Sequence, residues 1–128
     1  MIQPSLSDKE LLDQAKRVLA AEAAAVAGAS EQLEALPAIA RLLASCKGHI
    51  LVTGVGTSAA IARRLAHLLS CCGAPALPFE ASDGLHGGSG AITARDVLVV
   101  ISKGGKSAEI NRLVEIAKGR GARIVALT

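Results

Sequence analysis

The chain has 128 residues, which is enough for one domain with a hydrophobic core and too few for two. Hydrophobic residues make up 51% of it and its mean hydropathy is +0.44, so the class of intrinsically disordered chains is excluded. The 14 basic and 11 acidic residues leave a net charge of +3, which suits an anionic ligand. Nucleic acid is not expected as a partner, because there is no basic run and Phe79 is the only aromatic residue that could stack on a base.

The three cysteines show no C-x-x-C spacing and no spaced histidine partner, so we expect small buried or half-buried thiols in a reducing compartment. Neither a metal nor a cofactor is expected. No stretch approaches the ~18 consecutive apolar residues of a membrane span. The N-terminus lacks the basic region followed by an apolar region that is typical of a secretion signal. These features predict a cytoplasmic protein without a membrane partner.

The first third of the chain has the pattern of helices. Ser7-Asp8-Lys9-Glu10 is a capping box, which predicts the start of a helix. Apolar residues then recur at helical spacing: Leu11, Leu12, Ala15, Val18, Leu19 and Val26. Pro37 fits the first position of a second helix that ends near Gly48. We therefore expect residues 1–47 to form a helical arm, and its long Ala/Leu stripe predicts a homodimer or homotetramer.

From His49 onward, short apolar runs alternate with helical patterns. The expected strands are His49–Thr53, Ala76–Phe79, Asp96–Ile101 and Arg123–Leu127, the expected helices are Thr57–Cys72 and Lys106–Lys118, and residues 80–93 are expected to be a Gly/Ser-rich loop. This alternation predicts a three-layer αβα sandwich with a parallel, flavodoxin-like sheet over residues 48–128. The whole chain is then a single domain of an arm and an α/β core. Because such sheets normally continue past a fourth strand, we expect a core that is truncated or completed by a partner.

Two loops share one construction, in which a strand leads through a glycine-rich turn and hydroxyl residues to a helix. They are Gly54-Val55-Gly56-Thr57-Ser58 and Ser102-Lys103-Gly104-Gly105-Lys106-Ser107. Glycines let the backbone approach a ligand, and the free N–H groups and dipole of a helix start attract anions. If the strand order is 2-1-3-4, both loops flank the switch point where these sheets bind ligands. The pair predicts a site for a small phosphorylated ligand.

These loops have other interpretations. A nucleotide P-loop ending at Gly105-Lys106-Ser107 would need its first glycine at position 100, which is Val100. A dinucleotide-binding fragment remains an alternative, because Gly54-x-Gly56-x-x-Ala59 fits that fingerprint and Glu80 follows the next strand. A simple helix cap by Ser107 would explain the second loop alone, but not why two loops match.

At these two loops the sequence resembles the SIS (sugar isomerase) family of phosphosugar-binding domains. The second loop resembles the family's S-x-S-G-E-[ST] phosphate loop, and residues 86–93 resemble the H-G-D-L-G-M-I-T stretch of arabinose-5-phosphate isomerases. The resemblance implies that hydroxyls of Ser58, Ser102 and Ser107 hold the phosphate. It also implies a supporting set around the ligand: Gly56, Thr57, Lys103, Gly104, Gly105 and Lys106.

By the same resemblance, the function is aldose–ketose isomerisation of a sugar phosphate through an enediol, in a site shared between subunits. Such a reaction needs a base near the sugar, for which His86 is the candidate, with Glu80 open as base, metal ligand or solvent residue. Arabinose-5-phosphate isomerases have Lys at the place of Thr57 and Glu at the place of Lys106. These departures keep a second function open, a sugar-phosphate sensor without catalysis. Arg63 and Arg64 are interpreted as solvated helix charges.

Overall fold

A computed structural model describes residues 6–128 of the chain, with Gln32 described by its backbone alone. The chain divides into two compact units, residues 1–38 and residues 39–128. The first five residues of the expected arm lie outside the described part. The division thus falls before the expected boundary at residue 47, within the second helix of the chain.

The first unit is dominated by one long helix. Helix α1 (Asp8–Ala29) begins at Ser7, whose hydroxyl accepts the Glu10 N–H while the Glu10 carboxylate accepts the Ser7 N–H at 2.8 Å. The predicted capping box is therefore confirmed. A short 3-10 turn, η1 (Ser30–Gln32), follows. Within residues 6–128, no helix has the length and apolar character that crossing a membrane requires.

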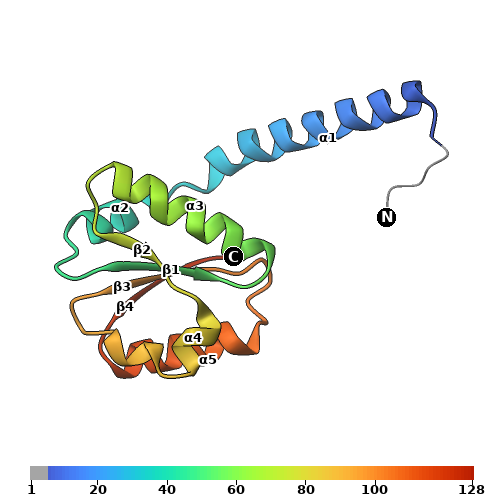
Figure 1. Cartoon of the computed structure of the whole chain (residues 1–128). Helices are drawn as coiled ribbons and strands as arrows, with labels where there is room; N and C mark the ends of the chain where they lie inside the picture. The colour runs from blue at the N-terminus through green and yellow to red at the C-terminus, as the bar shows by residue number, and fades with distance from the viewer. Residues whose placement is uncertain (1–5) are drawn as a thin grey trace. The chain divides into compact units, whose positions relative to one another are not determined.

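The second unit is built on a four-stranded parallel sheet (Figure 1). Its strands are β1 (Ile50–Gly54), β2 (Ala76–Pro78), β3 (Val97–Ile101) and β4 (Arg123–Leu127). They lie in the order β2-β1-β3-β4, with Ile50 of β1 aligned with Val97 of β3. The predicted strand order is confirmed, and it puts the carboxyl ends of β1 and β3 side by side.

Helices cover both faces of the sheet, as the continuous apolar strands predict. Helix α3 (Thr57–Cys71) lies on one face with α2 (Leu36–Ala44), and α4 (Ala81–Leu85) and α5 (Ala108–Gly119) lie on the other (Figure 1). Successive side chains of β1 point to opposite faces of the sheet, so that Val52 packs toward α3 while Leu51 packs toward α5. The α2 side chains from Ile39 onward pack into the α3-face core, which explains why the unit boundary precedes them.

The prediction of a plain loop over residues 80–93 was wrong. The segment holds α4 and a 3-10 turn, η2 (Gly88–Ala91). A helix as short as α4 has little stability of its own, so its packing must maintain it. Gly84 permits that packing, because a Cβ there would lie 2.8 Å from the Phe79 ring and 2.9 Å from the Leu113 side chain. The contacts that maintain α4 are tertiary, and no local sequence pattern predicts them.

Candidate functional site

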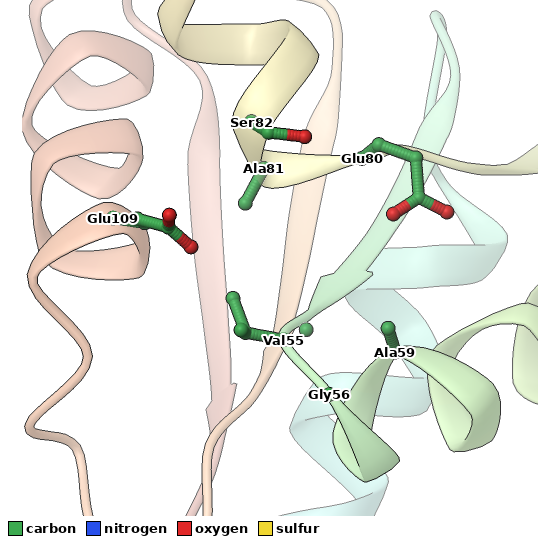
Figure 2. Close-up of a pocket in the computed structure, with 8 residues that line it drawn as sticks. Val55, Gly56, Ala59, Glu80, Ala81, Ser82 and Glu109 are labelled. Atoms are coloured by element: carbon green, nitrogen blue, oxygen red, sulfur yellow. The ribbon is translucent and has the colours of Figure 1, made fainter.

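A small hollow of about 100 Å³ lies at the carboxyl end of β1 (Figure 2). Its walls come from the β1–α3 turn, the β2–α4 link and the first turn of α5. The lining residues are Gly54, Val55, Gly56, Ala59, Glu80, Ala81, Ser82 and Glu109. After β1 the chain continues into the helix on one face of the sheet, and after β3 it continues into the helix on the other face. The carboxyl ends of these two strands are therefore the switch point at which doubly wound sheets bind ligands.

The β1–α3 turn brings the start of α3 close to the end of the strand. A Cβ on Gly54 would lie 2.7 Å from the Ser58 carbonyl carbon and 3.0 Å from the Ala59 nitrogen, so only glycine allows this approach. Gly56, the N-cap of α3, has φ 60° and ψ −128°, a conformation essentially restricted to glycine. Among the described residues no side chain caps α3, although the Ala59 N–H donates to the Gly56 carbonyl at 3.1 Å, and an uncapped helix start of this kind attracts anions.

The β3–α5 loop is folded back on itself. The Gly105 N–H donates to the Ser102 carbonyl at 3.3 Å, and Gly105 takes a positive φ of 61°. The Asn111 side-chain amide donates to the Gly105 carbonyl at 3.2 Å, which ties the loop to α5. Ser107 is the N-cap of α5 and accepts the Ile110 N–H at 3.5 Å. Hydrogen bonds within the chain thus hold the conformation of this loop. The Gly105 N–H already donates one of them, and the Ser107 hydroxyl already accepts one.

The predicted site residues divide into three groups. Gly56 and Glu80 line the hollow. The other predicted residues of the two loops do not line it: Thr57, Ser58, Ser102, Lys103, Gly104, Gly105, Lys106 and Ser107. His86, at the C-cap of α4, is exposed and is not part of the wall.

Sequence reasoning missed two polar wall residues, Ser82 and Glu109. Glu109 and Glu80 extend toward the hollow from different elements, α5 and the β2–α4 link (Figure 2). The strand order could have placed Glu109 there, since the first turn of α5 must start beside the end of β1. Ser82 had no such signal, because the helix that carries it was not predicted.

Glu80 and Arg63 form an ion pair, with Nη1 of Arg63 2.9 Å from Oε1 of Glu80. The Arg63 side chain is about half exposed, which agrees with its interpretation as a solvated charge on a helix. It also has a specific ion-pair partner, Glu80. That partner lies on a different element, so helical spacing could not identify it. Glu80 is also the N-cap residue of α4, but its side chain makes no capping hydrogen bond.

One hydroxyl near the site is buried without a partner. Among the described residues, the Oγ1 of Thr53 is the buried side-chain oxygen that accepts and donates no hydrogen bond. Strand alternation directs Thr53 to the α5 face together with Leu51, one residue before the wall of the hollow begins at Gly54. Buried polar groups without a partner within the protein are uncommon in folded proteins.

A buried carboxylate lies at the opposite, amino-terminal edge of the sheet. Asp96, 4% exposed, accepts the N–H of His49 at 2.7 Å and both the N–H and the hydroxyl of Thr93 at 2.7 and 2.9 Å. Burial by itself raises the pKa of Asp96, but these hydrogen bonds and the nearby His49 together bring the pKa below its ordinary value. Asp96 joins the starts of β1 and β3, which is a structural role remote from the hollow.

Comparison with protein families finds one match over most of the chain. The profile of the SIS domain matches residues 42–128. Arabinose 5-phosphate isomerase KpsF of Escherichia coli is 34% identical over 128 residues, which cover 98% of this chain and 39% of that protein. Arabinose 5-phosphate isomerase KdsD of Shigella flexneri is 34% identical over 83 residues, which cover 65% of this chain and 25% of that protein. The chain therefore spans about two fifths of the length of the KpsF relatives.

Solved structures show the same architecture. A Listeria monocytogenes protein described as a candidate sugar-phosphate isomerase superposes with a TM-score of 0.91 and 32% identity, over 95% of this chain and 65% of that one. An Escherichia coli CFT073 protein in complex with arabinose 5-phosphate superposes with a TM-score of 0.88 and 28% identity, over 94% of this chain and 65% of that one. The predicted α/β fold class is confirmed by these neighbours and by the sheet itself.

Proposed function

The chain belongs to the SIS domain family, and from that premise we propose that it binds a sugar phosphate and interconverts its aldose and ketose forms. The observation that carries the proposal is the hollow at the carboxyl end of β1, flanked by two glycine-rich loops that each open a helix. Arabinose 5-phosphate is the proposed substrate, because the KpsF and KdsD relatives carry that activity in their names.

The proposed ligand lies with its phosphate on the loops and its sugar in the hollow. A volume of about 100 Å³ is well below the roughly 300–1,000 Å³ typical of small-molecule pockets, so the hollow suits one end of the ligand. The open N-terminus of α3 and the hydroxyls of Ser58 and Ser102 supply donors for the phosphate. Lys103 and Lys106, both exposed, add the positive charge that a dianion requires.

The proposed chemistry is a proton transfer between adjacent carbons. A base removes the proton from C2 of the aldose, a proton moves from the O2 hydroxyl to O1, and the enediol then takes a proton at C1 to give the ketose. Glu80, which lines the hollow, is proposed to contact the sugar hydroxyls, and His86 is the proposed base. His86, exposed at the end of α4, is proposed to act on a ligand held by a neighbouring subunit.

Replacing Ser102 with alanine tests the binding proposal. A hydroxyl that donates to a charged phosphate contributes about 1.5–3 kcal/mol, so affinity for arabinose 5-phosphate should fall by about ten- to a hundredfold in titration calorimetry. Ser102 is preferable to Ser107, whose hydroxyl also caps α5. Ser45→Ala, at the exposed end of α2, is the matched control and should leave affinity unchanged. Equal affinities of the Ser102 and Ser45 variants would refute the loop assignment, and binding without conversion to ribulose 5-phosphate would refute the isomerase.

We also propose that the chain forms a homodimer or homotetramer. Helix α1 has no buried residue, and its large apolar side chains are exposed: Leu11, Leu12, Val18, Leu19 and Val26. Most of the stability of a helix in a protein comes from packing of its apolar face, so contact with a second copy would stabilise α1. Light scattering at micromolar concentration should give at least twice the monomer mass, and Leu12→Glu with Leu19→Glu should reduce it. A monomeric wild-type chain would contradict this.

A further inference from the structure

Among residues 6–128, the ion pair between Arg63 and Glu80 differs in kind from the other ion pair between exposed side chains, Arg112 with Glu115. Arg112 and Glu115 lie three residues apart on one helix, where such pairs are common. Arg63 and Glu80 come from two different elements, the second turn of α3 and the link between β2 and α4. This pair therefore connects the helix that starts at one wall of the hollow to the segment that forms another.

The backbone of the Glu80 segment is already held by the sheet. The Phe79 N–H donates to the Val52 carbonyl at 2.8 Å, and the Glu80 carbonyl accepts the Gly84 N–H at 3.0 Å. The Glu80 side chain is at the N-cap of α4, where a short polar side chain would fold back onto the helix. It makes no capping bond and extends to Arg63 instead. The direction of the carboxylate is thus set by Arg63, and not by the helix that it precedes.

Stability of the fold does not account for the pair. Arg63 and Glu80 keep 54% and 47% of their side-chain surface exposed, and exposed ion pairs contribute little to the free energy of unfolding. Glu109, the other carboxylate of the hollow, has no ion-pair partner among residues 6–128. Of the two acidic wall residues, only Glu80 has its direction fixed by an ion pair within the described part of the chain.

We propose that Arg63 is a positioning residue, which holds the Glu80 carboxylate against the hollow as the acceptor for hydroxyl groups of the sugar. The inference rests on the proposed function. The Glu80 acceptor would let the site distinguish a sugar phosphate from phosphate alone. The ion pair occupies Oε1 of Glu80 and leaves Oε2 to accept a hydrogen bond from the ligand. Inorganic phosphate bound at the loops has no sugar hydroxyl and gains nothing from this acceptor.

The test compares two ligands, arabinose 5-phosphate and inorganic phosphate, by titration calorimetry on the full chain. Arg63→Ala should weaken arabinose 5-phosphate binding about tenfold, the effect of losing one well-oriented bond to a charged group, and leave phosphate binding within about twofold. Arg63→Lys should recover part of the loss. Arg64→Ala is the matched control, because it removes the same charge from the next position of α3. If only the electrostatic field of the arginine mattered, Arg64→Ala would weaken arabinose 5-phosphate binding as much as Arg63→Ala.

A double-mutant cycle with Glu80→Gln decides whether Arg63 acts through Glu80. In the Glu80→Gln background, Arg63→Ala should change arabinose 5-phosphate affinity by less than about twofold. Thermal unfolding of Arg63→Ala should match that of Arg112→Ala, which removes an ion pair of the same 2.9 Å length.

The outcomes separate this inference from the proposed function. A wild-type chain that does not bind arabinose 5-phosphate overturns the proposed function and the inference with it. A wild-type chain that binds it, with Arg63→Ala no different from Arg64→Ala, overturns the inference alone. Equal losses for both ligands, or additive effects in the cycle, also overturn it.

Discussion

Replacing Gly54 with alanine is expected to cost about 3 kcal/mol of unfolding free energy and to disrupt the ligand site at the same time. The new Cβ would lie 2.7 Å from the carbonyl carbon of Ser58 and 2.8 Å from its oxygen. Both are backbone atoms, so no side-chain rotation can relieve the contact. The start of α3 must move away from β1, and the turn through Gly56 moves with it. Denaturant unfolding and titration with arabinose 5-phosphate measure the two effects.

A matched glycine separates the steric effect from the loss of glycine as such. A Cβ on Gly90 would meet no atom within 4 Å, and its φ is not positive. Gly90→Ala should therefore change stability by less than about 1 kcal/mol. If Gly54→Ala proves as stable as Gly90→Ala, the close approach of α3 to the end of β1 is not a requirement of the fold.

Replacing Asp96 with alanine is expected to destabilise the chain by about 3 kcal/mol and to lower its thermal midpoint by about 10 °C. The substitution leaves the N–H of His49 and the N–H and hydroxyl of Thr93 without their acceptor at a site that is almost inaccessible to water. The starts of β1 and β3 lose their common anchor. Asp96→Asn, which keeps one acceptor oxygen, should fall between the wild type and the alanine variant. Calorimetry at neutral pH provides the measurement.

The contribution of Asp96 should also depend on pH with a defined sign. Because the folded chain lowers the pKa of Asp96 below its ordinary value of 3.8, the ionised form favours folding. This stabilisation is fully present above the pKa of the unfolded chain and is lost as the pH falls through the lower, folded pKa. The difference in stability between wild type and Asp96→Ala should therefore be constant near neutral pH and shrink below about pH 4. A difference that instead grows on acidification would contradict the assignment.

The alternation of apolar runs and helical patterns was sufficient for most of the second unit. The expected strand Arg123–Leu127 coincides with β4, and the expected start of α3 at Thr57 is confirmed. These elements follow from local rules: parallel strands buried on both faces are continuously apolar, and glycine ends or precedes a helix. The same rules set the start of α5 two residues early, because Ser107 caps the helix and Ala108 begins it.

The composition of the hollow could be predicted only in part. Gly56 and Glu80 were identified from a glycine spacing and from a position after a strand, and both line it. Ser82 was missed because it lies on α4, a helix that depends on packing at Gly84 and not on its own propensity. His86 is exposed and does not line the hollow of its own chain, so its expected contact with the sugar stays a prediction.

By itself the sequence determined the capped first helix, the strands and helices of the parallel α/β core, and the two glycine-rich turns that precede helices, because each depends on the backbone preferences and hydrophobic period of a short segment. Only the tertiary structure decided which side chains meet. The pairing of Arg63 with Glu80, the approach of Glu109 to the same hollow and the anchoring of Asp96 across two strands join residues far apart in the chain. Such contacts follow from the distances between packed elements, which no local pattern encodes.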